Sequence, residues 1–309
     1  MDCPQAARSA GSVDLDTPAL GASGVFAEVV ESRPRLAEAG AHGGEVRSVR
    51  ASDHSRAAVA DRDGEALRAG DLVGADGANS VVRQTLDIPF EGFTWPERFL
   101  VVSTPFDFIS VFPDLSSVSY VADAEEWYFL LQIPDGLWRC MFPTRVEEAD
   151  NDILSDSRVQ ARMTRIHNPG VPYNVVHKTL YNVHQRVADT YRVGRILLTG
   201  DAAHINNPLG GMGMNGGIHD SFNLADKLIP VLRGDADPSA LDRYDEERRG
   251  VAMEYVQRIS IQNKKDLESD DPADQIAFRD RLLAAEGDTA KRRELLLRLS
   301  MLASLGKTI

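Results

Sequence analysis

The segment from Gly200 to Asp220 constrains the fold more than any other part of this sequence. It follows the apolar run 195–199, which is typical of a buried parallel strand. Asp201 is therefore predicted at the carboxyl end of a strand, where open α/β sheets bind ligands and a carboxylate can accept hydrogen bonds from sugar-like hydroxyls. Five glycines follow Pro208, so the loop backbone can lie flat against a planar ligand. A helix predicted over about 215–232 would direct its positive end at that ligand.

This loop also contains a G-x-G-x-x-G match at Gly211, Gly213 and Gly216. A dinucleotide fingerprint must follow its strand at once and needs an acidic residue at the end of a second strand, about 20 positions on. Here eleven residues separate the end of the strand at Thr199 from Gly211, and the acidic residues about 20 positions on follow a helix. The match is therefore interpreted as part of the loop and not as a Rossmann fingerprint.

A second candidate segment is Asp71 to Arg83 (DLVGADGANSVVR). A strand runs into a turn rich in Gly and Asp and then into a helix that Asn79 or Ser80 would cap. The N-terminus of that helix would offer N–H groups to an anion, and Arg83 would add a positive charge one turn later. The alternative is an ordinary capped strand-to-helix turn with no ligand.

Between these segments, residues 89–187 are rich in β-branched and aromatic residues and predict a mainly antiparallel sheet. A hairpin turn is expected at Pro134-Asp135-Gly136, and a helix is expected over 152–166. The predicted strands are 99–103, 118–122, 127–133, 137–142 and one or two within 174–187.

The rest of the chain divides into an N-terminal part and a helical C-terminal part. Residues 1–24 predict loop or disorder, 32–39 a short helix, and 46–49 and 56–60 short strands. Helices are predicted over 239–262 and 274–304. The apolar face of the first consists of Leu241, Tyr244, Val251, Tyr255 and Ile259, and the second is expected to pack Leu295, Leu296, Leu297 and Leu299 inward.

Together, the two candidate segments resemble the group A flavoprotein monooxygenases, which share the p-hydroxybenzoate hydroxylase fold. Asp76-Gly77 resembles the DG motif of the family and Gly200-Asp201 its GD motif, and residues 244–252 resemble the helix that follows. The resemblance implies an α/β fold: an incomplete Rossmann-like FAD-binding domain, an inserted antiparallel β substrate domain and C-terminal helices. The expected divisions are 1–88 (partial FAD-binding domain), 89–187 (substrate domain), 188–235 (return of the FAD-binding domain) and 236–309 (C-terminal helices).

The same resemblance implies roles for individual residues. Asp201 would hold the ribityl chain of FAD, and Asp76 and Arg83 would lie near its pyrophosphate and the path of the reductant. The loop and the N-terminus of the following helix would line the isoalloxazine ring and stabilise negative charge on it. His204 is expected to be structural, and no catalytic residue is assigned. The full set of implied cofactor contacts is Asp76, Gly77, Arg83, Gly200, Asp201, Pro208, Gly211, Met212, Gly213, Met214 and Asn215.

The activity implied by the resemblance is hydroxylation of a small phenolic substrate. NADH or NADPH would reduce FAD, and the reduced flavin would react with O2 to a C4a-hydroperoxide that transfers oxygen to the ring. Two alternatives stay open: a non-catalytic remnant with weak or no FAD binding, and another flavin oxidoreductase of the same fold. The halogenase motif W-x-W-x-I-P is absent from 127–134.

The sequence departs from the family pattern at its beginning. No G-x-G occurs before residue 200, although the family opens with a βαβ unit that carries G-x-G-x-x-G. We therefore expect this chain to bind FAD weakly or not at all, because the unit supplies the helix N-terminus that neutralises the pyrophosphate. We also expect the sheet to lack its central strand, which would leave two unpaired edges and exposed apolar faces.

Composition narrows the class of partner. Lys and Arg number 34 against 47 Asp and Glu, a formal net charge of −13, which disfavours nucleic acid and anionic membranes. No apolar run is long enough to span a membrane, and no signal peptide is visible. The two cysteines form no framework and the histidines show no metal spacing, so a cytoplasmic protein without a metal is expected. A homodimer is left open.

Overall fold

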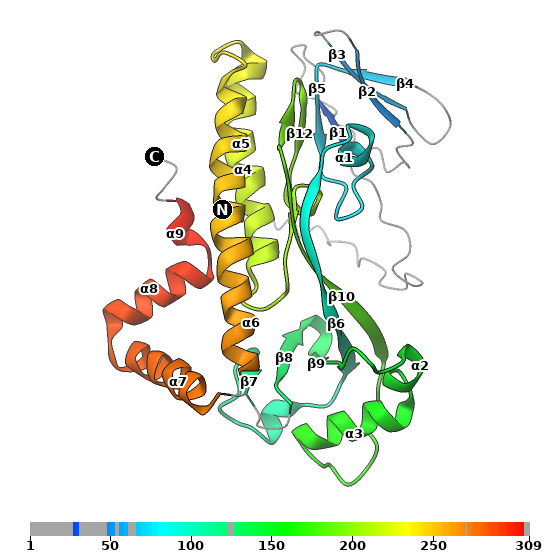
Figure 1. Ribbon diagram of the computed structural model, residues 1–309, viewed down its shortest axis with the longest axis vertical. Coiled ribbons are helices and arrows are strands. Elements are labelled where there is room, and N and C mark those ends of the chain that lie inside the picture. Colours follow the sequence, from blue (N-terminus) through cyan, green and yellow to red (C-terminus); the bar gives the residue numbers. More distant parts are fainter. Residues whose placement is uncertain are drawn as a thin grey trace, which may run out of the picture.

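The computed structural model contains three β-sheets and a layer of long helices (Figure 1). The helices α4 and α5 pack side by side, and the strands lie to one side of them. The fold is thus mixed α/β with C-terminal helices, as predicted. The structure describes residues 27–30, 48–52, 56–60, 66–122, 126–269 and 271–305. The predictions for 1–24 and 32–39 lie outside these residues.

The first sheet contains the strands that lead into the two candidate turns. Its strand order is β1-β5-β12-β11, where β5 (Asp71–Gly74) and β12 (Ile196–Leu198) are parallel neighbours. Both strands were predicted, and both are short buried runs. β11 (Arg192–Val193) pairs with β12 and β1 (Ala27–Val30) with β5, each antiparallel. The expected unpaired edges are not found beside β5, because it pairs with β12 on one side and with β1 on the other.

The second sheet has six antiparallel strands in the order β13-β10-β6-β9-β8-β7. Its two longest strands pair along most of their length, with one irregularity between Asn182 and His184. The predicted hairpin turn is a short 3-10 turn in which Asp135 and Gly136 have positive φ. The strands are β6 (Phe90–Thr104), β7 (Val118–Val121), β8 (Tyr128–Ile133), β9 (Leu137–Pro143), β10 (His177–Ala188) and β13 (His204–Ile205).

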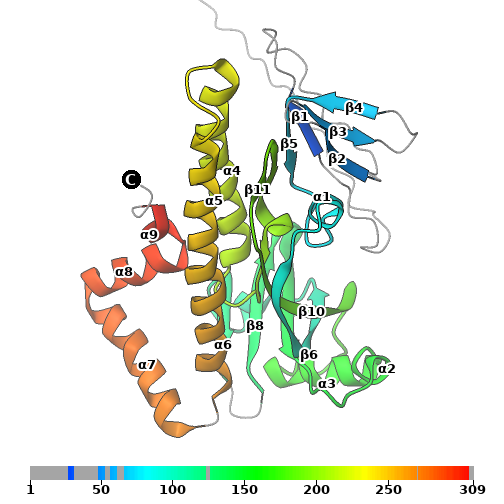
Figure 2. The same cartoon turned by 45° about the horizontal axis from the view of Figure 1, so that its top comes forward.

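A third, small sheet joins three strands near the N-terminus, drawn in blue in Figure 2. β2 (Ser48–Ser52) overlaps the strand predicted at 46–49, and β3 (Arg56–Ala60) matches its prediction to the residue. β4 (Ala66–Ala69) follows in this sheet, and after Gly70 the chain continues into β5 of the first sheet.

The helices lie where they were predicted but differ in their bounds. α4 begins at Met212, three residues before the predicted start, and the helix predicted over 239–262 continues to Glu268 and includes a π-helical stretch, η4. The helix predicted over 152–166 is divided into two and the helix predicted over 274–304 into three. The bounds are α1 (Val81–Thr85), α2 (Asp150–Ile153), α3 (Asp156–Ile166), α4 (Met212–Arg233), α5 (Ala240–Val251), η4 (Ala252–Ile259), α6 (Ser260–Glu268), α7 (Pro272–Gly287), α8 (Thr289–Leu299) and α9 (Leu302–Leu305); the 3-10 turns are η1 (Phe108–Ser110), η2 (Pro134–Gly136) and η3 (Gly200–Ala202).

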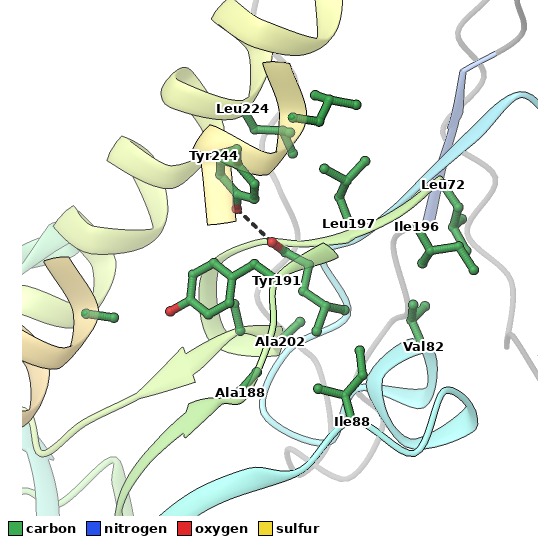
Figure 3. Packing of buried hydrophobic residues seen from close by; sticks show 14 of the residues in the cluster. Leu72, Val82, Ile88, Ala188, Tyr191, Ile196, Leu197, Ala202, Leu224 and Tyr244 are labelled. Atoms are coloured by element: carbon green, nitrogen blue, oxygen red, sulfur yellow. Dashed lines mark hydrogen bonds between the residues drawn. The ribbon is translucent and has the colours of Figure 1, made fainter. Parts of the chain in front are cut away.

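The core between the first sheet and the helices fixes the ends of β5 and β12. Figure 3 shows Leu197 of β12 directed toward Leu224 of α4 and Tyr244 of α5, while Leu72 of β5 lies beside Ile196 in the same buried cluster. The hydroxyl of Tyr244 donates a 2.7 Å hydrogen bond to the carbonyl of Leu198. The predicted apolar face of 239–262 is buried at all five positions.

The two faces of the six-stranded sheet have different coverings. One face packs Leu100, Trp138 and Phe142 against Val159 and Met163 of α3. The other face, formed around Phe99, Trp127 and Phe129, contacts Leu209 of the glycine-rich loop.

The prediction for the C-terminal leucines is only partly right. Leu295, Leu297 and Leu299 are half-buried, but Leu296 is 58% exposed on α8. Figures 1 and 2 show the reason: α7, α8 and α9 lie beyond α5 and α6 on the side away from the sheets, where one face of each helix has no neighbour among the described residues.

Candidate functional site

The turn after β5 is built around two buried side chains. Asp76 is 3% exposed, and its Oδ2 accepts the N–H of Val82 at 3.0 Å. Ser80 caps α1 by accepting the N–H of Arg83 at 2.9 Å. Fewer N–H groups of this helix are available to an anion than the sequence predicted, because those of Val82 and Arg83 are already bound within the turn. Oδ1 of Asp76 is buried with no partner in the described part of the chain.

Arg83 joins this turn to the segment after β12. Its guanidinium donates to the carbonyls of Ala202 at 2.8 Å and Ala78 at 2.7 Å, and it lies 3.7 Å above the ring of Phe90. Burial lowers the pKa of Arg83, and the nearby Asp76 opposes that change. The charge predicted to face a ligand thus contacts main-chain carbonyls of both candidate segments.

We expect Arg83→Met to lower the free energy of unfolding by about 2–3 kcal/mol, because it leaves the buried carbonyls of Ala202 and Ala78 without their charged donor. Thermal unfolding followed by circular dichroism would measure the change. Gln84→Met is the matched control, since Gln84 is exposed and should change stability by less than about 0.5 kcal/mol. Equal melting of the two variants would contradict this role for Arg83.

Asp201 follows β12 in the short turn η3, as predicted for the end of a parallel strand. Its side chain is exposed and forms no hydrogen bond or ion pair with the described residues. Partial desolvation raises the pKa of Asp201, and His204 opposes this shift. Gly200 before it has φ +60, a conformation that favours glycine. The turn therefore presents, at the carboxyl end of the sheet, a carboxylate that has no partner in the described part of the chain.

The three glycines near the start of α4 serve helix packing. A Cβ at Gly213 would lie 3.0 Å from Oδ1 of Asn206, and one at Gly216 would lie 3.1 Å from the ring of His204. A Cβ at Gly217 would lie 3.3 Å from the Cα of Gly200. These positions lie on one side of the helix and bring α4 close to the turn that carries Asp201. This geometry supports rejecting the Rossmann interpretation of the G-x-G-x-x-G match.

The loop before α4 is anchored from both sides. Asn207 is fully buried, and its N–H donates to Oε1 of Gln185 on β10 at 3.1 Å, while its Nδ2 donates to the carbonyl of Ser260 at 3.1 Å. On the other side, the N–H of Gly210 donates to the hydroxyl of Tyr120 on β7 at 2.8 Å. Burial raises the pKa of Tyr120, so this phenol stays protonated at neutral pH. The loop is thus fixed to the sheet and to the helix α6.

The residues that the sequence placed along this loop divide into accessible and buried ones. Gly211 and Met214 are exposed, Pro208 and Gly213 are half-buried, and Met212 is fully buried. The Met212 side chain belongs to the apolar cluster with Val251, Tyr255, Ile259 and Met301, so only its backbone can contact a ligand. Nδ2 of Asn215 donates to the carbonyl of Gly211 at 3.1 Å.

The N-terminus of α4 is open where that of α1 is not. Gly211 stands at the N-cap with φ +65, and no side chain caps the first turn. A helix of 22 residues with an uncapped first turn directs partial positive charge at whatever lies before it. The predicted electrostatic feature is thus present, beginning at Met212.

The sheet face beside the loop is aromatic. Tyr120 stacks on Phe129 with ring centroids 4.7 Å apart, and Phe129 pairs across the strands with Met141. Tyr181 on β10 pairs with Phe99, and partial burial together with the charge of Asp201 raises the pKa of Tyr181. The predicted aromatic wall therefore lies next to the loop, and Tyr181 lies within the field of Asp201.

Two buried charged residues of this region were not singled out from the sequence. Asp220 on α4 and Arg248 on α5 are at most 1% exposed and form an ion pair, with Nε of Arg248 2.6 Å from Oδ1 of Asp220. His204, expected to be structural, is also buried and contacts Oδ2 of Asp220 at 2.7 Å. A signal was present: Asp220 occupies the four-residue spacing of Met212, Gly216, Leu224 and Leu228, all of which are buried.

Two classes of site find no support in the described residues. No group of three or more His, Cys, Asp or Glu side chains there could hold a metal ion. Within the same residues, none of the helices has the length and apolar character needed to cross a membrane.

A family profile described as FAD binding domain matches residues 29–259. Para-nitrophenol 4-monooxygenase from Pseudomonas sp. (strain WBC-3) is 36% identical over 244 residues, which cover 76% of this chain and 59% of that protein. This chain therefore spans less than two thirds of the length of that relative.

Two solved structures are also similar to this chain. p-Nitrophenol 4-monooxygenase PnpA from Pseudomonas putida DLL-E4 has a TM-score of 0.74 and 30% identity, with 84% of this chain and 67% of that chain covered. Aklavinone-11 hydroxylase, solved in a ternary complex with FAD and aklavinone, has a TM-score of 0.64 and 28% identity, with 72% and 43% covered.

Proposed function

Because this chain belongs to the FAD-binding domain family and is related to aromatic monooxygenases, we propose that it forms the flavin and substrate sites of an FAD-dependent phenol hydroxylase. The observation that carries the proposal is the exposed, unpaired carboxylate of Asp201 at the end of β12, beside an uncapped helix and a glycine-rich loop. The division into FAD-binding segments 1–88 and 188–235, substrate domain 89–187 and C-terminal helices 236–309 is part of the proposal.

The residues present fit a bound flavin. Oδ1 of Asp76 is buried without a partner among the described residues and is free to accept a hydrogen bond. A Cβ built at Gly77 or at Gly211 would meet nothing within 4 Å, so both glycines adjoin open space. Asp201 has no competing donor in the described residues. These features lie at the carboxyl ends of β5 and β12, the edge at which open α/β sheets hold ligands.

Each element then has a defined task. Asp201 would accept hydrogen bonds from the ribityl hydroxyls, and the backbone from Gly211 to Asn215 would lie along the ring system. The uncapped N-terminus of α4 would stabilise negative charge on the pyrimidine end of the ring. The chemistry that FAD supplies when bound is hydride acceptance from NADH or NADPH and activation of O2 for transfer to the substrate ring.

The substrate side is the aromatic sheet face. Tyr120 and Tyr181 are exposed on this face, and they lie against the buried rings of Phe129 and Phe99, an aromatic surface that suits a small aromatic ring. The names of the related enzymes specify a nitrophenol and hydroxyphenyl acids. We therefore propose a phenol as substrate, with O2 as co-substrate. A cytoplasmic location is also proposed, supported by the free, buried thiol of Cys140.

We expect p-nitrophenol or 3-(3-hydroxyphenyl)propionate to accelerate NADH or NADPH oxidation by the FAD-saturated protein and to raise O2 consumption with it. The measurement is absorbance at the NAD(P)H band together with an oxygen electrode. Nitrobenzene, which lacks the hydroxyl, is the matched control and should not accelerate oxidation. Turnover without O2, or a halogenated product that requires chloride, would contradict the reaction class. If the protein retains no flavin after incubation with excess FAD and removal of the unbound FAD, the non-catalytic alternative is favoured.

A further inference from the structure

The carboxylate of Asp220 connects three segments that are far apart in sequence. Its Oδ2 accepts from Nε2 of His204 at 2.7 Å and from the N–H of Gly200 at 3.3 Å. Its Oδ1 accepts from Nε of Arg248 at 2.6 Å. Gly200 and His204 are the two ends of the five-residue turn that contains Asp201. One buried side chain on α4 thus fixes both ends of the turn that presents the proposed ribityl contact.

The surroundings of Asp220 leave it little freedom. Arg248 also donates to the carbonyl of Gly216 at 3.4 Å, one turn before Asp220 on the same helix. The ring of His204 stacks on Tyr191, with centroids 6.2 Å apart. Asp220 is fully buried, and His204 and Arg248 lower its pKa against the opposing effect of burial. The carboxylate therefore stays charged and keeps all three donors at neutral pH.

A buried ion pair alone would not require this arrangement. A pair between Asp220 and Arg248 could hold α4 to α5 without either contact to the turn. Yet Oδ2 is used for the turn alone, and the Gly200–Gly217 approach allows α4 to come close enough for those two contacts. The hydrogen bonds to Gly200 and His204 hold the two ends of the turn, while Arg83 and the N–H of Ala188 hold the carbonyls of Ala202 and Ala203.

We propose that Asp220, with its partners His204 and Arg248, is the positioning residue for Asp201 and thereby tunes the affinity for FAD. The inference rests on the proposed function for the FAD part, and on the geometry alone for the anchoring of the turn. Asp220 does not touch the ligand in this proposal. It acts through the main chain of residues 200–204.

The test compares two ways of removing the carboxylate. Asp220→Leu removes the hydrogen bonds from Gly200 and His204 to this carboxylate but leaves Arg248 buried without its partner, which can unfold the protein. Asp220→Leu combined with Arg248→Met removes both charges, so stability should recover while the two ends of the turn still lack their contacts with α4. Asp245→Asn is the matched control, because Asp245 on α5 accepts from Thr190, from the N–H of Tyr191 and from Arg249 and has no contact with the turn.

Two readouts are taken on the whole chain, well below the melting temperature of each variant. Amide hydrogen exchange is followed for 200–204, and FAD affinity is measured by quenching of flavin fluorescence. For the double variant we expect faster exchange confined to 200–204 and FAD affinity weaker by about tenfold, the effect of one displaced hydrogen bond. Asp245→Asn should leave both unchanged within about twofold.

The outcomes separate the two claims. Unchanged exchange at 200–204 in the double variant overturns the anchoring role, and recovery of wild-type FAD affinity together with stability shows that the network is merely structural. If the wild-type chain binds no FAD, the proposed function fails, and the exchange measurement still decides whether Asp220 anchors the turn.

Discussion

Replacing Asp201 by alanine is expected to weaken FAD binding ten- to a hundredfold. The carboxylate stands exposed at the carboxyl end of β12 and has no partner among the described residues, so its capacity to accept hydrogen bonds is free for a ligand. A charge-assisted hydrogen bond to a hydroxyl contributes about 1.5–3 kcal/mol, which corresponds to that range of affinity. Fluorescence titration of FAD with wild-type and variant protein measures the ratio directly.

The controls separate this contact from the loss of charge. Asp189→Ala removes an exposed carboxylate directly after β10 and should leave the affinity unchanged within about twofold. Asp201→Asn keeps one acceptor oxygen and should fall between the wild type and alanine. Equal affinity of the wild type and Asp201→Ala would remove Asp201 from the cofactor site. Because the side chain is exposed and unpaired, stability should hardly change in either variant.

The parts of the fold that the sequence predicted are those with a clear period or a buried run. β5 and β12 are short apolar segments that lead into turns rich in Gly and Asp, and β12 is the buried parallel strand that was predicted. The apolar face from Leu241 to Ile259 follows helical spacing and is buried throughout. In both cases the burial of side chains determines the spacing of apolar residues, so this spacing predicts the type of element.

The start of α4 was missed because its residues are poor helix formers. Glycine at 213, 216 and 217 costs about 1 kcal/mol each relative to alanine in a helix. Close packing against Gly200, His204 and Asn206 overrides that preference, and this packing is visible only in three dimensions. The helix therefore begins at Met212, and the side chain of this residue is buried in the core.

The polar contacts of the site depend on distant partners, so spacing could not predict them. Arg83 was expected to face a ligand, but its donors are directed to Ala202, which is 119 residues away. Asp220 was passed over although it lies on the buried face of its helix, because nothing in the local sequence points to Arg248 and His204 as its partners. The prediction of unpaired edges in the first sheet failed for the same reason, because β1 pairs with β5, which lies more than 40 residues further along the chain.

Gly92 lies in the six-stranded sheet beside Gln185, the residue of β10 that holds the glycine-rich loop. It lies on β6 opposite Arg186 of β10 and has φ +136, a conformation that side chains rarely adopt. A Cβ at Gly92 would overlap the carbonyl oxygen of Gln185 and lie 2.9 Å from the Cα of Arg186. Both obstacles are backbone atoms, so no rotamer change can relieve them. Gln185 in turn holds Asn207, the buried anchor of the loop.

We therefore expect Gly92→Ala to lower the free energy of unfolding by about 4 kcal/mol and the melting temperature by about 8–16 °C. The displaced backbone of Gln185 should also loosen the loop, so amide exchange at 207–211 should rise in the native state. Gly136→Ala is the matched control: φ is +72 there, but a Cβ meets nothing within 4 Å, and only the backbone preference of about 1–2 kcal/mol is lost. Thermal unfolding of the two variants isolates the steric part. Equal melting temperatures would mean that β6 and β10 do not approach each other as closely at Gly92 as this register requires.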